Sequence, residues 1–449
     1  MKNYDYVIVG SGPNGLAAAI TLAQNGRSVL VLEAKDTIGG GTRTSELTLP
    51  GFMHDVCSAV HPLGVASPFF RNLQLGQHGL EWIFPPVALA HPFDDGSAAA
   101  IQQDDHVNIQ NIGRDDRAYQ RIFRPLVKNW QKLLDDLLGP FPIPPKHPFI
   151  DLRFAVNALL SVEQFSKFHF KEPMAQALFA GMSGHGMLPL DKIMSASFGL
   201  MLGTLAHAVG WPIPKGGSQS ISNAMASYFV ELGGEIRLNT PIDSIDSLHD
   251  ARSILFDVTP KQFIKICQEK LPENYLRRLS KFRYGLGVFK IDWALKEPIP
   301  WTADGCKLAS TVHVGGTLEE ISHAESEIWA GRHPEKPLVI VTQPSLFDPM
   351  RAPDGQHTAW AYSHVPTGST FNMTEIIESQ IERFAPGFRD VILARSEMNP
   401  VQLESYNANY VGGDINGGVQ DLLQFFTRPI PQWNQYTTPI KNVFICSSS

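Results

Sequence analysis

Glycines at fixed spacing near the start of the chain are the clearest sign of chemistry in this sequence. Gly10, Gly12 and Gly15 form a GxGxxG pattern directly after a short apolar run, and Pro13 and Asn14 lie between its last two glycines. The first glycine permits a tight turn, the second lets the backbone approach a pyrophosphate, and the third lets a helix pack closely on a strand. We expect these five residues to contact a dinucleotide.

The segments around this motif are of the kind that a dinucleotide site needs. Residues 16–24 are rich in strong helix formers, and residues 28–32 are a second apolar run that ends at Glu33. A carboxylate about 20 residues after the motif accepts hydrogen bonds from ribose hydroxyls, and it disfavours the 2′-phosphate of NADP. A strand, a glycine turn, a helix and this acidic residue together favour dinucleotide binding over an ordinary turn without a ligand.

A second glycine cluster follows Glu33 after a few residues. The run from Ala34 continues into Gly40, Gly41, Thr42 and Arg43. Exposed backbone N–H groups beside a guanidinium suit the second face of a pyrophosphate, although a flexible loop is the alternative interpretation. We expect all five of these residues to contact the cofactor.

The two glycine clusters together resemble the FAD-dependent amine oxidase and phytoene desaturase superfamily, and this resemblance implies FAD instead of NAD. Residues 211–218 and 233–245 look like the family's Pro-x-Gly-Gly helix and the strand pair that meets the adenine, which would place Ile242 against that ring. Three later segments are similar to the phytoene-dehydrogenase-related branch, which includes the pyridine nucleotide-disulphide oxidoreductase domain-containing protein 2 type: residues 284–301, 360–366 and 382–387.

The resemblance also implies an α/β fold in which a Rossmann-like FAD-binding domain is interleaved with an α+β substrate domain. Residues 1–75, 210–265 and 400–449 would form the FAD-binding domain. Residues 76–209 and 266–399 would form the substrate domain.

Histidines and cysteines are the residues that could carry other chemistry. In the family, the segment 54–61 passes near the isoalloxazine, so His61 could face the flavin or the substrate, or could simply be hydrogen-bonded in the core. The 15 histidines include no HExxH or HxH pattern, and the cysteines have no ligand spacing, so we expect no metal site. A nucleophile elbow would need glycine where His185 stands, which argues against a hydrolase.

Composition limits the remaining classes of protein. The formal net charge is −7 and no basic stripe is visible along the chain, so a nucleic-acid partner is not expected. Four scattered cysteines indicate free thiols, and the first residues run into a strand without a secretory signal. Residues 193–211 are mostly apolar but interrupted, which favours a buried helix over a membrane span. We expect a cytoplasmic protein, with peripheral membrane contact left open.

The leading hypothesis is a FAD-dependent oxidoreductase that moves a hydride between flavin and a hydrophobic, isoprenoid or lipid-like substrate, with oxygen or a quinone-like compound as electron acceptor. No catalytic residue is assigned. The alternatives are a non-catalytic lipid- or prenyl-binding, chaperone-like protein on the same fold, and an amine oxidase. In the family, a glycine-rich turn and a helix follow the last strand, whereas here the strand at 442–446 is followed only by Ser447–Ser449. We therefore expect weak FAD retention unless another polypeptide supplies the missing element.

Overall fold

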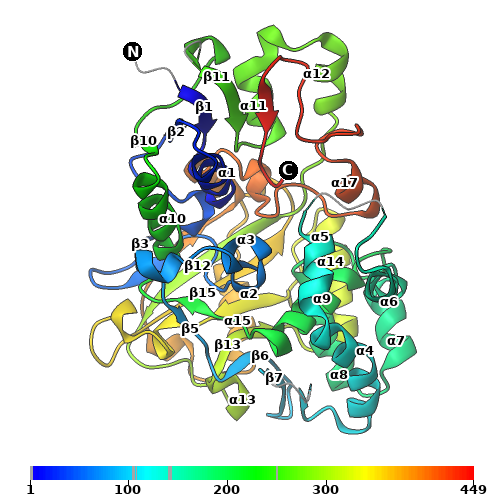
Figure 1. Ribbon diagram of the computed structural model, residues 1–449. Helices are drawn as coiled ribbons and strands as arrows, with labels where there is room; N and C mark the ends of the chain where they lie inside the picture. The colour runs from blue at the N-terminus through cyan, green and yellow to red at the C-terminus, as the bar shows by residue number, and fades with distance from the viewer. Residues whose placement is uncertain (1–3, 104–106, 108, 140–143, 249–250) are drawn as a thin grey trace.

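A parallel sheet near one end of the molecule carries the N-terminal motif (Figure 1). The computed structural model describes residues 4–103, 107, 109–139, 144–248 and 251–449. The strands of this sheet are all parallel and lie in the order β10 (Glu235–Arg237), β2 (Val29–Leu32), β1 (Tyr4–Val9), β11 (Ala251–Phe256) and β17 (Val443–Ile445). The predicted strand–helix–strand unit is present, because α1 (Pro13–Gln24) connects β1 to β2.

Helices cover both faces of the parallel sheet, as its continuous apolar strands require. On one face, α1 packs with α10 (Gln219–Glu231) in a cluster that includes Ile8, Val31 and Phe229. On the other face, α11 (Pro260–Cys267) and α12 (Glu273–Leu279) bury Phe256.

A larger mixed sheet forms the centre of the second half of the molecule. Its strands lie in the order β16 (Ile392–Met398), β12 (Gly287–Leu295), β15 (His357–Val365), β14 (Val339–Thr342), β13 (Ala309–Val314), β6 (Val87–Pro92), β7 (Ala98–Gln102) and β8 (Ile109–Gln110). Neighbouring strands are antiparallel except β13 and β6. One face is apolar and packs on α15 (Thr374–Glu382) through residues such as Ile291 and Ile377.

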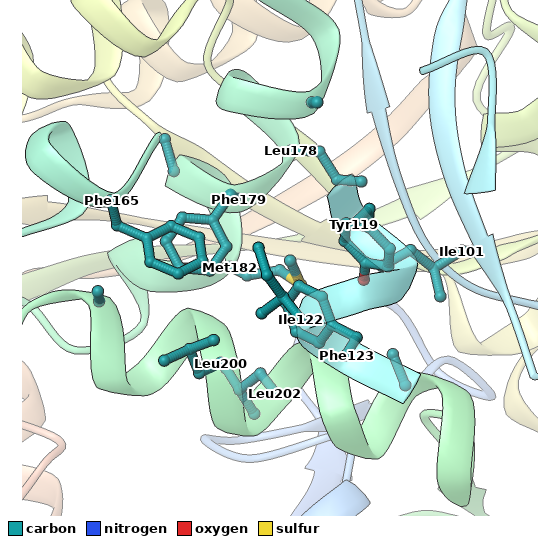
Figure 2. Packing of buried hydrophobic residues seen from close by; sticks show 14 of the residues in the cluster. Ile101, Tyr119, Ile122, Phe123, Phe165, Leu178, Phe179, Met182, Leu200 and Leu202 are labelled. Carbon is teal, nitrogen blue, oxygen red and sulfur yellow. The ribbon is translucent and has the colours of Figure 1, made fainter. Parts of the chain in front are cut away.

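A layer of helices covers the β6–β8 side of this sheet. It contains α4 (Asp116–Lys128), α5 (Trp130–Leu137), α6 (Pro148–Ala158), α7 (Val162–His169), α8 (Pro173–Gly184), α9 (Ala196–Ala208) and α14 (Leu318–Trp329). Figure 2 shows Phe165 from α7 stacked on Phe179 from α8, and the core of this layer also contains Phe123 from α4.

The apolar stretch at 193–211 forms α9, whose side chains are mostly buried between α8 and the other helices, as expected for a buried helix. Within the described ranges, no helix is both long enough and apolar enough to cross a membrane. The division into two discontinuous domains stays a prediction, although the parallel sheet does draw its strands from three separate segments of the chain.

Candidate functional site

The first glycine motif forms a tight turn that only glycine fits. Gly10 has a φ of +107°, and a Cβ at Gly15 would overlap the Gly10 carbonyl oxygen. A Cβ at Gly12 would lie 2.9 Å from the carboxylate of Asp257, which follows β11. Pro13 begins α1, so the unpaired N–H groups of the first helical turn lie directly after the glycines.

Glu33 connects this turn to the second glycine cluster. It is buried at the end of β2 and accepts hydrogen bonds from the Ser11 amide at 3.1 Å and the Lys35 amide at 3.0 Å. The Ser11 hydroxyl also donates to Glu33, and Arg43 forms an ion pair with it at 3.4 Å. The carboxylate is therefore held in place by four donors at the position that the sequence predicted for it.

The second glycine cluster lies against the first. A Cβ at Gly40 would lie 3.2 Å from the Gly12 Cα, and the Gly39 amide donates to the Ser11 carbonyl at 3.1 Å. Thr42 is turned into the core, where its hydroxyl hydrogen-bonds Ser222. The two clusters predicted from sequence therefore form one glycine-lined surface.

The position of the predicted adenine contact is only partly as expected. The sequence predicts a strand pair over residues 233–245, but only Glu235–Arg237 forms a strand. The prediction of a second strand was therefore wrong. The Thr240 amide instead donates to the Glu33 carbonyl at 2.8 Å. Ile242, two residues further on, is half-buried, whereas Ala34, directly after Glu33, is exposed.

Buried polar atoms without partners lie beside this glycine surface. Among the described residues, Arg43 Nε and the Tyr406 hydroxyl are buried with no hydrogen-bond partner, and the Arg43 guanidinium lies 5.8 Å from the centre of the Tyr406 ring. Buried polar groups are almost always satisfied in native proteins. A ligand rich in acceptors, such as the pyrophosphate of a dinucleotide, fits these donors and the glycine surface beside them.

Asp257 is a residue of this site that sequence reasoning missed. Its carboxylate accepts a hydrogen bond from the Gly15 amide at 2.8 Å. Burial raises the pKa of Asp257 to about 7, and the nearby negative charge of Glu33 adds to the effect. The only sequence signal for it was an acidic residue at the end of an apolar run, directly before Val258.

A second group of candidate residues lies on one face of the eight-stranded sheet. Strand register sets Lys290 opposite Tyr362, Tyr362 opposite Ile340, and Ile340 opposite His313. Successive side chains of a strand alternate between faces, so Asp292, two residues beyond Lys290, shares this face. The opposite face is the apolar one described above. We call the face of Lys290, Asp292, Tyr362 and His313 the polar face of the sheet.

Lys290 and Asp292 form a buried ion pair next to His54 of β4 (Met53–Asp55). The distance between His54 Nδ1 and Asp292 Oδ1 is 3.5 Å. Burial raises the pKa of Asp292 to about 6, although Lys290 opposes the shift. Burial, with Lys290 and Arg351 adding to it, lowers the pKa of His54 to about 3, so this imidazole is neutral at physiological pH.

Histidines extend the polar face toward β13. His185 Nε2 and His313 Nε2 are 2.9 Å apart, and His364 Nδ1 is 2.8 Å from a Glu325 carboxylate oxygen. Burial lowers the pKa of His185 to about 3, and it lowers the pKa of His313 as well. The His185–His313 pair is therefore a hydrogen bond between two neutral rings. Among the described residues, no three potential ligands lie close enough to hold a metal ion.

The polar face and its surroundings hold a concentration of unsatisfied atoms. In the described part of the chain, the following buried atoms here have no hydrogen-bond partner: Asp292 Oδ1, His54 Nδ1, Trp360 Nε1, His313 Nδ1, His91 Nδ1, His364 Nε2 and Glu325 Oε2. Such a cluster is typical of a site that binds a polar group or ordered water.

The segment from His54 to Ser58 connects the two groups of residues. The Val56 amide donates to the Arg43 carbonyl at 2.8 Å, and the Ser58 amide donates to the Gly41 carbonyl at 3.1 Å. Cys57 lies between Val56 and Ser58, and burial raises the pKa of its thiol. The glycine surface and the polar face therefore lie next to each other.

His61, three residues beyond this segment, is hydrogen-bonded in the interior. Its Nε2 atom lies 2.8 Å from the Ser218 hydroxyl, which in turn donates to the Ser58 carbonyl. Burial lowers the pKa of His61 to about 4, so the ring is neutral. This arrangement is the one expected of a core histidine, and a flavin- or substrate-facing role for His61 stays a prediction.

Comparison with known proteins identifies the family. Residues 14–262 match the flavin containing amine oxidoreductases, and this span is more than half of the chain and includes Gly15, Glu33, the second glycine cluster and Asp257. The chain belongs to this family. It is a flavin-dependent oxidoreductase, and the predicted resemblance to the amine oxidase and phytoene desaturase superfamily is confirmed.

The relatives of this flavin-dependent oxidoreductase span most or all of its length. Pyridine nucleotide-disulfide oxidoreductase domain-containing protein 2 of Mus musculus is 24% identical over 99% of this chain and 90% of its own. Phytoene desaturase (neurosporene-forming) of Rhodobacter capsulatus is 26% identical over 80% of this chain and 72% of its own. An oxidoreductase from Methanosarcina mazei shares the fold with a TM-score of 0.66 at 16% identity, covering 98% of this chain and 93% of its own. The predicted α/β fold is confirmed.

Proposed function

We propose that the chain binds FAD on the glycine surface and oxidises an organic substrate held against the polar face of the eight-stranded sheet. The observation that carries the proposal is the connection between the two through residues 54–58. When bound, FAD supplies an acceptor for a hydride, so the protein has only to bind, orient and enclose the reactants.

The cofactor-binding residues are proposed as the sequence predicted them. Glu33 accepts hydrogen bonds from the ribose, since its carboxylate is already fixed by Ser11 and Lys35. The N–H groups of the glycine turn and the start of α1 bind the pyrophosphate, and Arg43 supplies a positive charge.

Lys290, Asp292 and His54 are the proposed groups that act on the substrate. Asp292 changes its protonation state near neutral pH, and its Oδ1 atom has no hydrogen-bond partner among the described residues. It can therefore hold the proton that leaves a substrate when a hydride is removed from the neighbouring atom. Lys290 fixes the Asp292 carboxylate, and neutral His54 borders it.

The proposed substrate is mainly hydrophobic, isoprenoid or lipid-like, and carries one polar group. The name of the phytoene desaturase of Rhodobacter capsulatus supports an isoprenoid substrate in this family. Trp360 and Tyr362, which stack at 5.6 Å on the polar face, offer apolar contact area. The unsatisfied nitrogen and oxygen atoms around them favour the additional polar group. Oxygen or a quinone-like compound remains the proposed electron acceptor.

Anaerobic reduction of the FAD-loaded protein tests the proposal. Candidate isoprenoid alcohols and lipid-like amines are mixed with the holoprotein, and loss of the visible flavin absorption is followed. We expect reduction by one of these classes, and Asp292→Asn slows it without removing FAD. Asp304→Asn, a change at an exposed aspartate outside the polar face, is the control. Protein that binds lipid but holds no flavin would contradict the proposal and support the chaperone-like alternative.

A further inference from the structure

The helix α6 is apolar on two opposite faces, although only one of them is covered. Ile150, Phe154 and Ala158 pack into the core of the helical layer. On the outer face, Phe149 is 90% exposed, and Leu152 and Val156 are more than half exposed. A contiguous apolar surface that is exposed marks a site of interaction with a protein or a membrane, so this outer face calls for a covering partner.

The exposed apolar area continues onto neighbouring segments. Phe168 of α7 is 81% exposed, and it lines a groove of about 630 Å³ together with residues of α4 and α6. Leu159 and Ile193 are also exposed, and they are adjacent because the Met194 amide donates to the Leu159 carbonyl. The three helices lie at the same side of the molecule in Figure 1. We call this surface the outer face, defined by the side chains of Phe149, Leu152, Val156, Leu159, Phe168 and Ile193.

A basic stripe borders the outer face. Arg117, Arg121, Arg124 and Lys128 are spaced by four, three and four residues on α4, and all four are exposed. This stripe cannot be seen as a run of charge along the chain, which is why the sequence indicated none. Arg121 lines the groove itself, as does Arg153 of α6, which donates to the Arg121 carbonyl at 2.9 Å.

The cations of the stripe are available to a partner. Arg114, just before α4, pairs with Glu172. By contrast, within the part of the chain that the structure describes, Arg117, Arg121, Arg124 and Lys128 form no ion pair with a carboxylate. Aliphatic and aromatic side chains beside unpaired cations are the combination that binds the boundary between acyl chains and anionic headgroups.

We propose that the outer face and the stripe dock the protein onto an anionic lipid bilayer. The phenylalanines and aliphatic side chains enter the headgroup boundary, while the arginines and Lys128 contact lipid phosphates. A second copy docked through the same surface would bring two equal basic stripes together, which like-charge repulsion disfavours. A nucleic acid would pair with the cations, but the aliphatic side chains of Leu152, Val156 and Ile193 offer no ring on which a base could stack. The inference does not depend on the proposed substrate.

Vesicle sedimentation with the FAD-loaded protein tests this proposal. The probes are vesicles of phosphatidylcholine alone and of equal parts phosphatidylcholine and phosphatidylglycerol, at low and high NaCl. We expect binding to the anionic vesicles that is at least about tenfold tighter than to the neutral ones and that weakens in high salt.

Two sets of variants separate the apolar from the basic contribution. Phe149→Ser with Phe168→Ser, and separately Arg117→Gln with Arg121→Gln and Arg124→Gln, should each weaken anionic vesicle binding at least about tenfold. All of these side chains are exposed, so the fold tolerates the changes. Trp433→Ser, at an almost fully exposed tryptophan outside the outer face, is the matched control and should bind like the original protein.

A conservative variant supplies a readout that does not depend on loss of binding. Phe149→Trp keeps an aromatic ring, and its fluorescence should shift to the blue when anionic vesicles are added. The proposal is overturned by equal affinity for neutral and anionic vesicles, or by tighter binding to an oligonucleotide than to the vesicles. It is also overturned if Phe149→Ser with Phe168→Ser abolishes a protein dimer while vesicle binding stays unchanged.

Discussion

At the scale of single residues, Glu33 carries the most specific expectation. Glu33→Gln keeps the shape of the side chain but removes the charge that strengthens hydrogen bonds to ribose hydroxyls. We expect a loss of roughly 1.5–3 kcal/mol of FAD affinity, measured by fluorescence titration. Asp36→Asn, an exposed change three residues away on the same loop, should leave the affinity unchanged. Equal affinity of the Glu33→Gln variant would mean that the ribose binds elsewhere.

Asp257 predicts a pH dependence of cofactor binding. Its pKa of about 7 means that the carboxyl group is largely neutral below this pH and negative above it. A negative charge next to the Gly15 amide repels a pyrophosphate, so FAD affinity should fall several-fold as the pH rises from about 6 to about 8. Asp257→Asn keeps an acceptor for Gly15 and should flatten this profile.

The same group makes folding stability pH-dependent. Its pKa is 3.8 when unfolded and higher when folded, so the folded state binds the proton more tightly. Its contribution to stability is therefore fully present below pH 3.8 and falls as the pH rises toward about 7, after which this group contributes no further change. Urea unfolding of the original protein and of Asp257→Asn at these pH values measures the difference. An identical slope in both proteins would contradict the raised pKa.

The residues that sequence analysis found and missed differ in a physical way. One local strand–helix–strand unit contains Gly10, Gly12, Gly15 and Glu33, so their spacing alone predicts that they lie close together. Asp257 contacts the same turn at Gly15, which lies 242 positions away in the chain. No local pattern encodes such a contact, because it depends on β11 pairing with β1.

At the scale of elements, the close packing of α1 on β1 leaves no room for a side chain at Gly15. Alanine normally stabilises a helix relative to glycine by about 1 kcal/mol. Here the added Cβ would overlap the Gly10 carbonyl, so Gly15→Ala should instead destabilise the fold by about 1–3 kcal/mol in urea unfolding. Gly76→Ala, which has no heavy atom within 4 Å of the new Cβ, is the control. A neutral Gly15→Ala variant would contradict the geometry of the turn.

Elements were predicted well where hydrophobic pattern and helix formers agreed, as for β1, α1, β2 and the buried α9. The failure after Arg237 has a local reason. Asn239 has a positive φ of 50° and Pro241 lacks an amide, so neither residue suits a strand ladder. The Asn239 and Thr240 amides bind the carbonyls of Lys35 and Glu33 instead.

At the scale of the whole molecule, the polar face shows what sequence could not supply. Lys290, Tyr362 and His313 come from β12, β15 and β13. In the sheet β15 lies between β12 and β14, and β13 follows β14, so the order of these three strands in the sheet is not their order in the chain. No pattern within its own segment marks any of these residues, and only the strand register places them on one face of the sheet. The sequence could predict the family and the meeting of the two glycine clusters but not this face.

The polar face predicts a pH profile for turnover. Because Asp292 has a pKa of about 6 and is proposed to act as a base in its ionised form, flavin reduction by substrate should rise with pH through about 6. Lys290→Met removes the cation that favours the ionised form, so the rise should move to higher pH while FAD stays bound. Stopped-flow reduction at several pH values measures both. A profile that is unchanged in Lys290→Met would show that this pair does not act on the substrate.

The central claim is that the glycine surface and Glu33 together select FAD. Equilibrium titration of the flavin-free protein with FAD and with NAD, in one buffer, tests it most directly. The account predicts that FAD binds at least about tenfold more tightly, which corresponds to about 1.4 kcal/mol. NAD binding that equals or exceeds FAD binding would contradict it.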